Sequence, residues 1–252
     1  VTAYLLSATA VTPLYGKLSD IHGRRPVILA GIVIFVVGSI ACALAPTLPL
    51  LILARAVQGL GGGGLISLAQ TIVGDAVSPR ERGRYQGYFG AVFAASSIAG
   101  PVLGGVFAEY LHWSLIFWIN VPIGLAAYLI VGRSLKMLPR HERPHRLDIL
   151  GAILMVAASL TLLLALNWGG TRYAWSSAPI AMLLVGSVVL WGLFGWRIAI
   201  APEPFVPFAI MRNRVVAAAM GSAFFAYGTM IALAIYAPLY FEIVLGLSAS
   251  MS

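Results

Sequence analysis

The chain has 252 residues, of which 60% are hydrophobic and 10% are charged, and its mean hydropathy is +0.94. Such a composition excludes a water-soluble core and is typical of a chain that lies in lipid. The 16 Lys and Arg residues, against 8 Asp and Glu residues, would suit a nucleic-acid surface in a soluble protein. Here they lie in short stretches between apolar runs, so we expect a lipid bilayer as the partner and no nucleic acid.

Eight apolar runs follow one another along the chain. The first, residues 1–15, opens at Val1 without a preceding basic stretch, so we expect a truncated span in a fragment of a longer protein. About 20 helical residues cross the ~30 Å hydrocarbon layer, and the later runs are long enough to do so. These runs cover residues 27–45, 48–73, 85–106, 115–131, 149–168, 178–196 and 215–239. The predicted fold class is an all-α polytopic membrane protein with seven whole spans and one truncated span.

Lys and Arg residues gather on one side of these spans. That side holds Lys17, Arg24, Arg25, Arg80, Arg82, Arg84, Arg133, Lys136, Arg140, Arg143, Arg146, Arg197, Arg212 and Arg214. The opposite side holds Arg172, and Arg55 falls inside a span. Because cytoplasmic connections collect positive charge, we predict that the basic connections are cytoplasmic. We expect a multi-pass protein of the cell membrane, in the bacterial inner membrane.

A charged stretch at residues 16–26 separates the first two apolar runs, and we predict a polar turn there. Asp20 is its acidic residue. On charge and side of the membrane alone, we expect Asp20 to find its partners among Arg80, Arg82 and Arg84.

Arg55 is the most informative single residue, because a guanidinium within a span is costly, by roughly 2.5 to more than 10 kcal/mol depending on the reference state. One interpretation is that Arg55 extends to the outer headgroups. The other is that it faces a neighbouring helix or cavity, because Gln58 and Gly59 follow on the same helix face. The glycines at 61–64 predict close helix packing and a place where the helix bends.

The next span carries small residues and a proline, namely Gly87, Ser96, Gly100, Pro101, Gly104 and Gly105. Pro101 removes a backbone donor and predicts a kink. The glycines thin one side of the helix, which suits either a static packing contact or a mobile gate.

The sequence shows no motif that indicates a catalytic, metal-binding or phosphate-binding site. The histidines lie in connections or at span edges, without a Cys, His or carboxylate at metal-ligand spacing, and they are His22, His112, His141 and His145. The glycine run lies in a span and no Gly-Lys-Ser/Thr follows it, which argues against phosphate binding. We therefore expect no enzyme, cofactor or metal, and we interpret Cys42 as a packing residue. The pattern predicts no particular oligomeric state.

Three motifs resemble those of the major facilitator superfamily, and within it the drug:proton antiporters with fourteen helices. The loop between the second and third helices is matched by Gly16, Leu18, Asp20, Gly23, Arg24 and Arg25. The fourth-helix motif is matched by Leu51, Arg55, Gln58, Gly59 and Gly61. The antiporter motif of the fifth helix is matched by Gly87, Gly100, Pro101, Gly104 and Gly105, with Ser96 where a glycine is usual.

The resemblance implies alternating access between two helical halves. It implies a conformational latch at Gly16, Asp20, Gly23, Arg24 and Arg25, and proton coupling through Arg55 and Gln58. It implies helix packing or a gate at Gly59, Gly61 and the fifth-helix residues. Glu109 and Glu242 are candidate outer-side contacts, and Glu242 stands where the family usually has Gln. The acidic first helix and most of the second half are expected to lie outside this chain.

On this basis we expect five parts. They are an N-terminal helical half without its first helix (1–132), a basic cytoplasmic link (133–147), two additional spans (148–198), a second cytoplasmic link (199–214) and the start of the C-terminal half (215–252). The expected function is proton-coupled export of amphipathic small molecules, of the multidrug efflux type. The alternatives are a metabolite or siderophore transporter of the same fold and a membrane sensor that does not transport.

Overall fold

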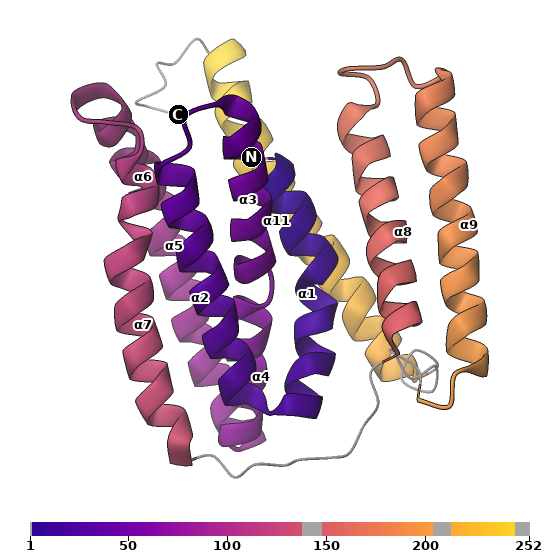
Figure 1. The fold of residues 1–252 in the computed structure, drawn as a ribbon, viewed down its shortest axis with the longest axis horizontal. Coiled ribbons are helices and arrows are strands. Elements are labelled where there is room, and N and C mark those ends of the chain that lie inside the picture. Colours follow the sequence, from indigo (N-terminus) through magenta and orange to yellow (C-terminus); the bar gives the residue numbers. More distant parts are fainter. Residues whose placement is uncertain (1, 138–147, 204–212, 245–252) are drawn as a thin grey trace. The chain divides into compact units, whose positions relative to one another are not determined.

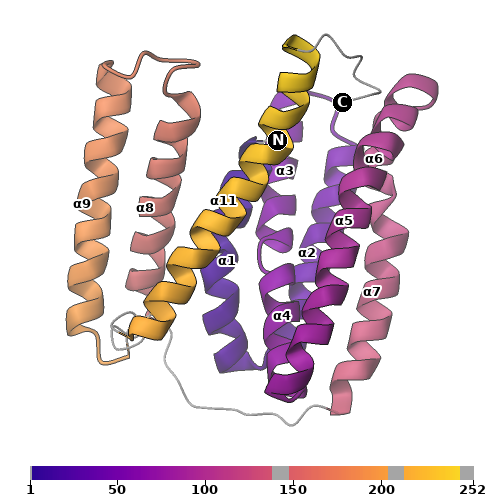
Figure 2. The same ribbon diagram turned by 180° about the vertical axis from the view of Figure 1, so that it is seen from behind.

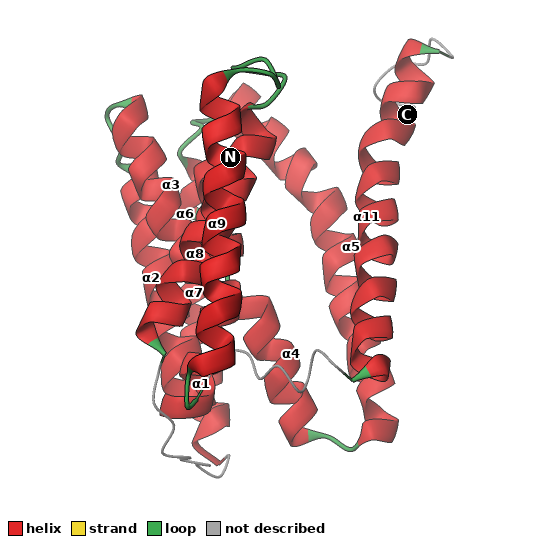
Figure 3. Ribbon diagram, turned by 90° about the vertical axis from the view of Figure 1, so that its right-hand side faces the viewer, coloured by secondary structure: helices red, strands yellow, loops and turns green. Residues whose placement is uncertain are grey.

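The computed structural model describes residues 2–137, 148–203 and 213–244, and the secondary structure in these ranges is almost entirely helical (Figures 1 and 3). Contacts divide the chain into two units, Val1–Phe205 and Val206–Ser252. The first contains α1 (Thr2–His22), α2 (Arg24–Ala43), α3 (Leu48–Gly62), α4 (Leu65–Ala76), α5 (Pro79–Tyr110), α6 (Leu115–Trp118), α7 (Asn120–Ser134), the short 3₁₀ helix η1 (Leu135–Met137), α8 (Ile149–Trp168) and α9 (Ala178–Ile200). The second contains α11 (Arg214–Ile243).

Seven described stretches are long and apolar enough to cross a membrane, which confirms the predicted number of whole spans. Their hydrophobic side chains remain widely exposed in the structure, as expected of surfaces that face lipid. The third and fourth helices form one of these stretches, Leu48–Ala76. The chain is therefore a multi-pass membrane protein.

The predicted polar turn at residues 16–26 is wrong in its extent. Helix α1 continues through the charged residues to His22, and α2 begins at Arg24. Gly23 alone lies between them, with φ of +89°, a left-handed conformation that L-residues with a side chain rarely adopt. One residue therefore makes the whole reversal, so the charged side chains stand on helix ends instead of on a loop.

Helix α3 lies against both α1 and α2, and its glycines make the two contacts possible. A Cβ on Gly59 would collide with the Tyr4 carbonyl of α1, and one on Gly61 would lie 2.7 Å from Phe35 Cα of α2. Bare backbone at these positions lets the three helices approach more closely than side chains would allow.

The span formed by α3 and α4 is interrupted at residues 63–64, within the glycine run. Side chains of α1 bind the carbonyl groups that the interruption frees. Tyr15 donates its hydroxyl hydrogen to the Leu60 carbonyl at 2.7 Å, and Thr12 donates to the Gly63 carbonyl at 2.6 Å. Tyr15 also packs with Ile28 and Leu68 in the buried core of the unit. The break is thus stabilised by specific donors, as buried backbone groups require.

Helices α8 and α9 form an antiparallel pair that lies side by side (Figures 1 and 2). Buried Asp148 joins their ends: its Oδ1 accepts from the Gly151 N–H at 3.0 Å, which caps α8, and from Arg197 Nε of α9 at 3.0 Å. Halfway along, Ser187 Oγ donates to the Ala158 carbonyl at 3.2 Å. The turn at the other end has Gly170 at φ of +75° and Arg172 over the Trp168 ring.

The second unit consists of α11, whose start is capped by the Asn213 side chain accepting from the Val215 N–H at 2.9 Å. Most of the first predicted link and more than half of the second lie outside the described residues. The five predicted parts remain a prediction.

Candidate functional site: two polar clusters in the helical bundle

A charge cluster lies where α1 meets α2. Arg24 binds Asp20 Oδ1 at 2.6 Å through Nη1, and it binds Asp75 Oδ2 of α4 at 2.9 Å through Nε. The same Nη1 also donates to the hydroxyl of buried Ser19. The turn at Gly23 places Arg24 four residues after Asp20 and beside it. One guanidinium therefore ties α1, α2 and α4 together.

The prediction that Asp20 pairs with Arg80, Arg82 or Arg84 was wrong. Asp20 pairs with Arg24, and Arg82 instead donates to the Gly74 carbonyl at 2.7 Å. Sequence reasoning missed Asp75. Its signal was an acidic residue at the end of a span, directly before a basic connection.

Arg25 and Gly16, which belong to the same motif as Asp20 and Arg24, lie near this charge cluster. Arg25 donates from Nε to the Gly132 carbonyl of α7 at 3.1 Å, which links α2 to the end of α7. The Gly16 carbonyl accepts from Ser19 Oγ at 2.7 Å, and beyond its own turn of helix no described atom lies within 4 Å of the place where a Cβ would be. The ends of α1, α4 and α7 are thus all tied to the start of α2.

A second cluster surrounds Arg55 inside the membrane-spanning part of α3. Arg55 Nη1 donates to Gln58 Oε1 at 2.6 Å. Gln58 is 1% exposed, and its Nε2 donates to Ser39 Oγ of α2 at 2.6 Å. Cys42, which is fully buried as its interpretation as a packing residue requires, lies with its Sγ 3.9 Å from Gln58 Oε1. We call these four residues the Arg55 cluster.

Aromatic rings cover the guanidinium of Arg55 from neighbouring helices. Its Cζ lies 4.6 Å from the centroid of the Tyr4 ring of α1 and 5.5 Å from that of the Phe117 ring of α6. Such cation–π contacts are worth about 0.5–2 kcal/mol each. Together with the bond to Gln58, they offset part of the cost of a charge at this depth. Arg55 therefore faces its neighbouring helices, which favours the second of the two interpretations.

The fifth-helix positions behave differently. Apart from the nearby backbone of α5 itself, no described atom lies within 4 Å of a Cβ built on Gly87, Gly100, Gly104 or Gly105. Helix α5 runs unbroken from Pro79 to Tyr110, so it passes through Pro101 as one helix. The thin face of α5 is open within the described part of the first unit, and the kink and the gate remain predictions.

The two carboxylates expected at the outer side, Glu109 and Glu242, belong to different units. Glu109 is exposed near the end of α5, and Glu242 lies in α11, with its side chain outside the described residues. Their role as outer-side contacts remains a prediction.

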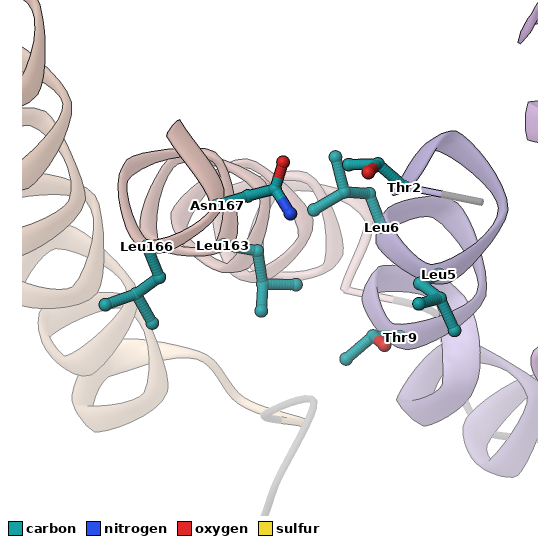
Figure 4. A pocket seen from close by; sticks show the side chains of 7 residues that line it. All are labelled: Thr2, Leu5, Leu6, Thr9, Leu163, Leu166 and Asn167. Atoms are coloured by element: carbon teal, nitrogen blue, oxygen red, sulfur yellow. The ribbon is translucent and has the colours of Figure 1, made fainter. Parts of the chain in front are cut away.

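A shallow groove of about 280 Å³ runs between α1 and α8 (Figure 4). Its lining residues are Thr2, Leu5, Leu6, Thr9, Leu163, Leu166 and Asn167. In Figure 4 the Asn167 side chain points from α8 toward Leu6 and Thr2 of α1. The groove is lined mainly by leucines, and none of its lining residues belongs to either polar cluster.

Comparisons with known proteins agree with this architecture. The family model described as the Major Facilitator Superfamily matches residues 1–252. Multidrug resistance protein 3 of Bacillus subtilis is 40% identical over 248 residues, covering 98% of this chain and 48% of that protein. The efflux pump dotC of Dothistroma septosporum is 39% identical over 252 residues, covering 97% of this chain and 43% of that protein.

An uncharacterised MFS-type transporter of Mycobacterium tuberculosis is 39% identical over 252 residues, covering 100% of this chain and 36% of that protein. The chain thus spans less than half the length of each of these relatives. The family match over every residue, with spans in the expected number, shows that the chain belongs to the Major Facilitator Superfamily.

Proposed function

We propose that the whole protein exports amphipathic small molecules in exchange for protons, by alternating access. The observation that carries the proposal is the Arg55 cluster, in which buried Gln58 binds a partly buried guanidinium inside a membrane span. The names of relatives, a multidrug resistance protein and an efflux pump, support the substrate class. Because this chain spans less than half of those relatives, the activity belongs to the full-length protein.

A guanidinium stays protonated in proteins, so Arg55 itself does not carry the transported proton. Its role is electrostatic: it stabilises the charged form of an acidic group when that group lies close, and it loses this contact when the group moves away. In the family that the chain resembles, the first helix carries such an acidic residue.

The charge cluster at Arg24 suits a conformational latch on the cytoplasmic side. Its two carboxylates, Asp20 and Asp75, each have side chains 51% exposed, and the Arg24 side chain is 23% exposed. Ion pairs with this exposure contribute about 0–1 kcal/mol each, because solvent screens them. Such contacts hold one conformation while still allowing it to open during each transport cycle.

Dye efflux from cells that carry the full-length protein tests the proposal. We expect efflux to collapse when the proton gradient is dissipated, and Arg55→Ala to abolish gradient-driven efflux at normal expression. Arg172→Ala is the matched control, because it removes an arginine from the turn between α8 and α9, away from both clusters. Unchanged efflux in Arg55→Ala would refute the coupling role.

Direction of transport separates export from uptake of a metabolite or siderophore. Substrate that accumulates on the side of the basic connections would contradict export. For the latch, Asp20→Asn is expected to impair transport while membrane insertion stays normal, and normal transport in this variant would leave the charge cluster without a role in the cycle.

A further inference from the structure

In the Arg55 cluster, Ser39 determines which end of the Gln58 amide donates a hydrogen bond and which end accepts one. Ser39 is fully buried in α2, and its hydroxyl donates to the Phe35 carbonyl at 2.9 Å. A hydroxyl has a single hydrogen to donate. With that hydrogen on the α2 backbone, the Ser39 oxygen can only accept from a second partner, and Gln58 Nε2 lies 2.6 Å away.

The orientation of the Gln58 amide follows from this. Its NH₂ group must face Ser39, so its Oε1 faces the opposite way, where Arg55 Nη1 donates at 2.6 Å and Cys42 Sγ lies at 3.9 Å. Arg55 has only donors. A reversed amide would set an NH₂ group against the guanidinium, and Arg55 and buried Gln58 would both lose a hydrogen bond.

We propose that Ser39 is a positioning residue for Arg55: by keeping its own hydrogen on the α2 backbone, it selects the one orientation of the Gln58 amide that binds the guanidinium. The proposal that Ser39 positions Arg55 is argued only from the contacts in the structure. Its consequence for transport rests on the coupling role proposed above for Arg55.

Helix packing at this level does not depend on the Ser39 hydroxyl. A Cβ on Gly38 would lie 2.6 Å from the backbone nitrogen of Gln58, so the close approach of α2 and α3 is made by Gly38. Ser39→Ala removes one oxygen and leaves that contact in place. The Gln58 amide then loses one of the two partners that fix its orientation and keeps only Arg55.

Labelling of Cys42 in the full-length protein reads out this orientation without reference to transport. Among the described residues, the titratable or charged members of the cluster are Arg55 and Cys42, and Tyr4 contacts Arg55 from α1. In Ser39→Ala the hydrogen bond from the Cys42 thiol to Gln58 weakens as the amide rotates. We expect a membrane-permeant maleimide to modify Cys42 roughly tenfold faster, the effect of one lost hydrogen bond on local opening.

The matched control is Ser187→Ala in α9. Ser187 is also a buried serine whose hydroxyl donates to a helix carbonyl, but it does not contact Gln58. Mass spectrometry of the Cys42 peptide gives the labelling rate, and the pH profile of efflux is recorded in parallel. We expect Ser39→Ala to shift that profile by roughly 0.5–1 pH unit, and Ser187→Ala to change neither quantity.

The two readouts separate the two claims. Faster labelling with a shifted profile supports both the positioning by Ser39 and the coupling role of Arg55. Faster labelling with an unchanged profile supports the positioning and overturns the coupling role. Labelling no faster than in Ser187→Ala overturns the positioning, whatever the profile does.

Discussion

Replacement of Gly61 by valine tests the close contact between α2 and α3. A Cβ at this position would collide with the Phe35 backbone nitrogen, and it would lie 2.7 Å from Phe35 Cα and 2.8 Å from the Gly31 carbonyl oxygen. Nonbonded carbon atoms ordinarily sit about 3.5–4.0 Å apart. All of these obstacles are backbone, so the helices must separate by roughly 1 Å to accept the side chain.

The expected cost has two sources. Overpacking of a tight contact costs about 1–3 kcal/mol. Separation of the helices also lengthens the bond between Gln58 and Ser39, worth about 1 kcal/mol when made. We therefore expect Gly61→Val to lower the free energy of unfolding by roughly 2–4 kcal/mol more than the same exchange at Gly192. Gly192 is exposed inside α9, and beyond the nearby backbone of α9 no described atom lies within 4 Å of a Cβ built there.

Both exchanges change helix propensity in the same way, so their difference isolates packing. The measurement is the melting temperature of the full-length protein in detergent, followed by loss of the monodisperse peak in size-exclusion chromatography. Equal melting temperatures for the two variants would refute the reasoning that bare backbone at Gly61 is required.

The remaining predictions concern single polar contacts. Tyr15→Phe removes the donor that binds a freed carbonyl at the break between α3 and α4, so it should cost about 1 kcal/mol relative to Tyr128→Phe, a partly exposed tyrosine. Arg197→Gln leaves the Asp148 charge buried without its partner, whereas Asp148→Asn leaves a guanidinium that reaches solvent. We therefore expect Arg197→Gln to be the more destabilising by roughly 2–3 kcal/mol, and the double variant to recover most of the loss. An equal loss in both single variants would contradict this asymmetry, and melting temperatures in detergent measure both predictions.

The span pattern was predictable because its physical cause is local. A helix in lipid must be long and apolar, and the sequence shows both properties directly. The glycine run predicted a bend in a single helix, and the structure interrupts the helix there, after Gly62. The extent of α1 was not predictable, because its charged end is stabilised by a contact with the next helix, where Arg24 of α2 pairs with Asp20 across the turn at Gly23.

The partners of the site residues were harder to predict, because they depend on which helix faces which. Asp75 lies 51 residues after Arg24, and Ser39 lies 19 residues before Gln58. Neither separation corresponds to neighbouring positions on one helix, so the sequence alone did not predict either contact. A serine in an apolar run does not by itself predict a partner, and the role of Ser39 follows only from the contact between α2 and α3, which places it beside the Gln58 amide.

Coupling of substrate flux to protons is the central claim, and proteoliposomes that contain the full-length protein test it most directly. An acidic lumen is imposed, and a dye with a permanent positive charge is supplied outside, so that trapping of a weak base cannot contribute. An antiporter predicts accumulation of the dye inside, collapse of the accumulated dye when a protonophore is added, and no accumulation in vesicles with Arg55→Ala protein. Accumulation that is the same with and without the pH gradient would contradict the account.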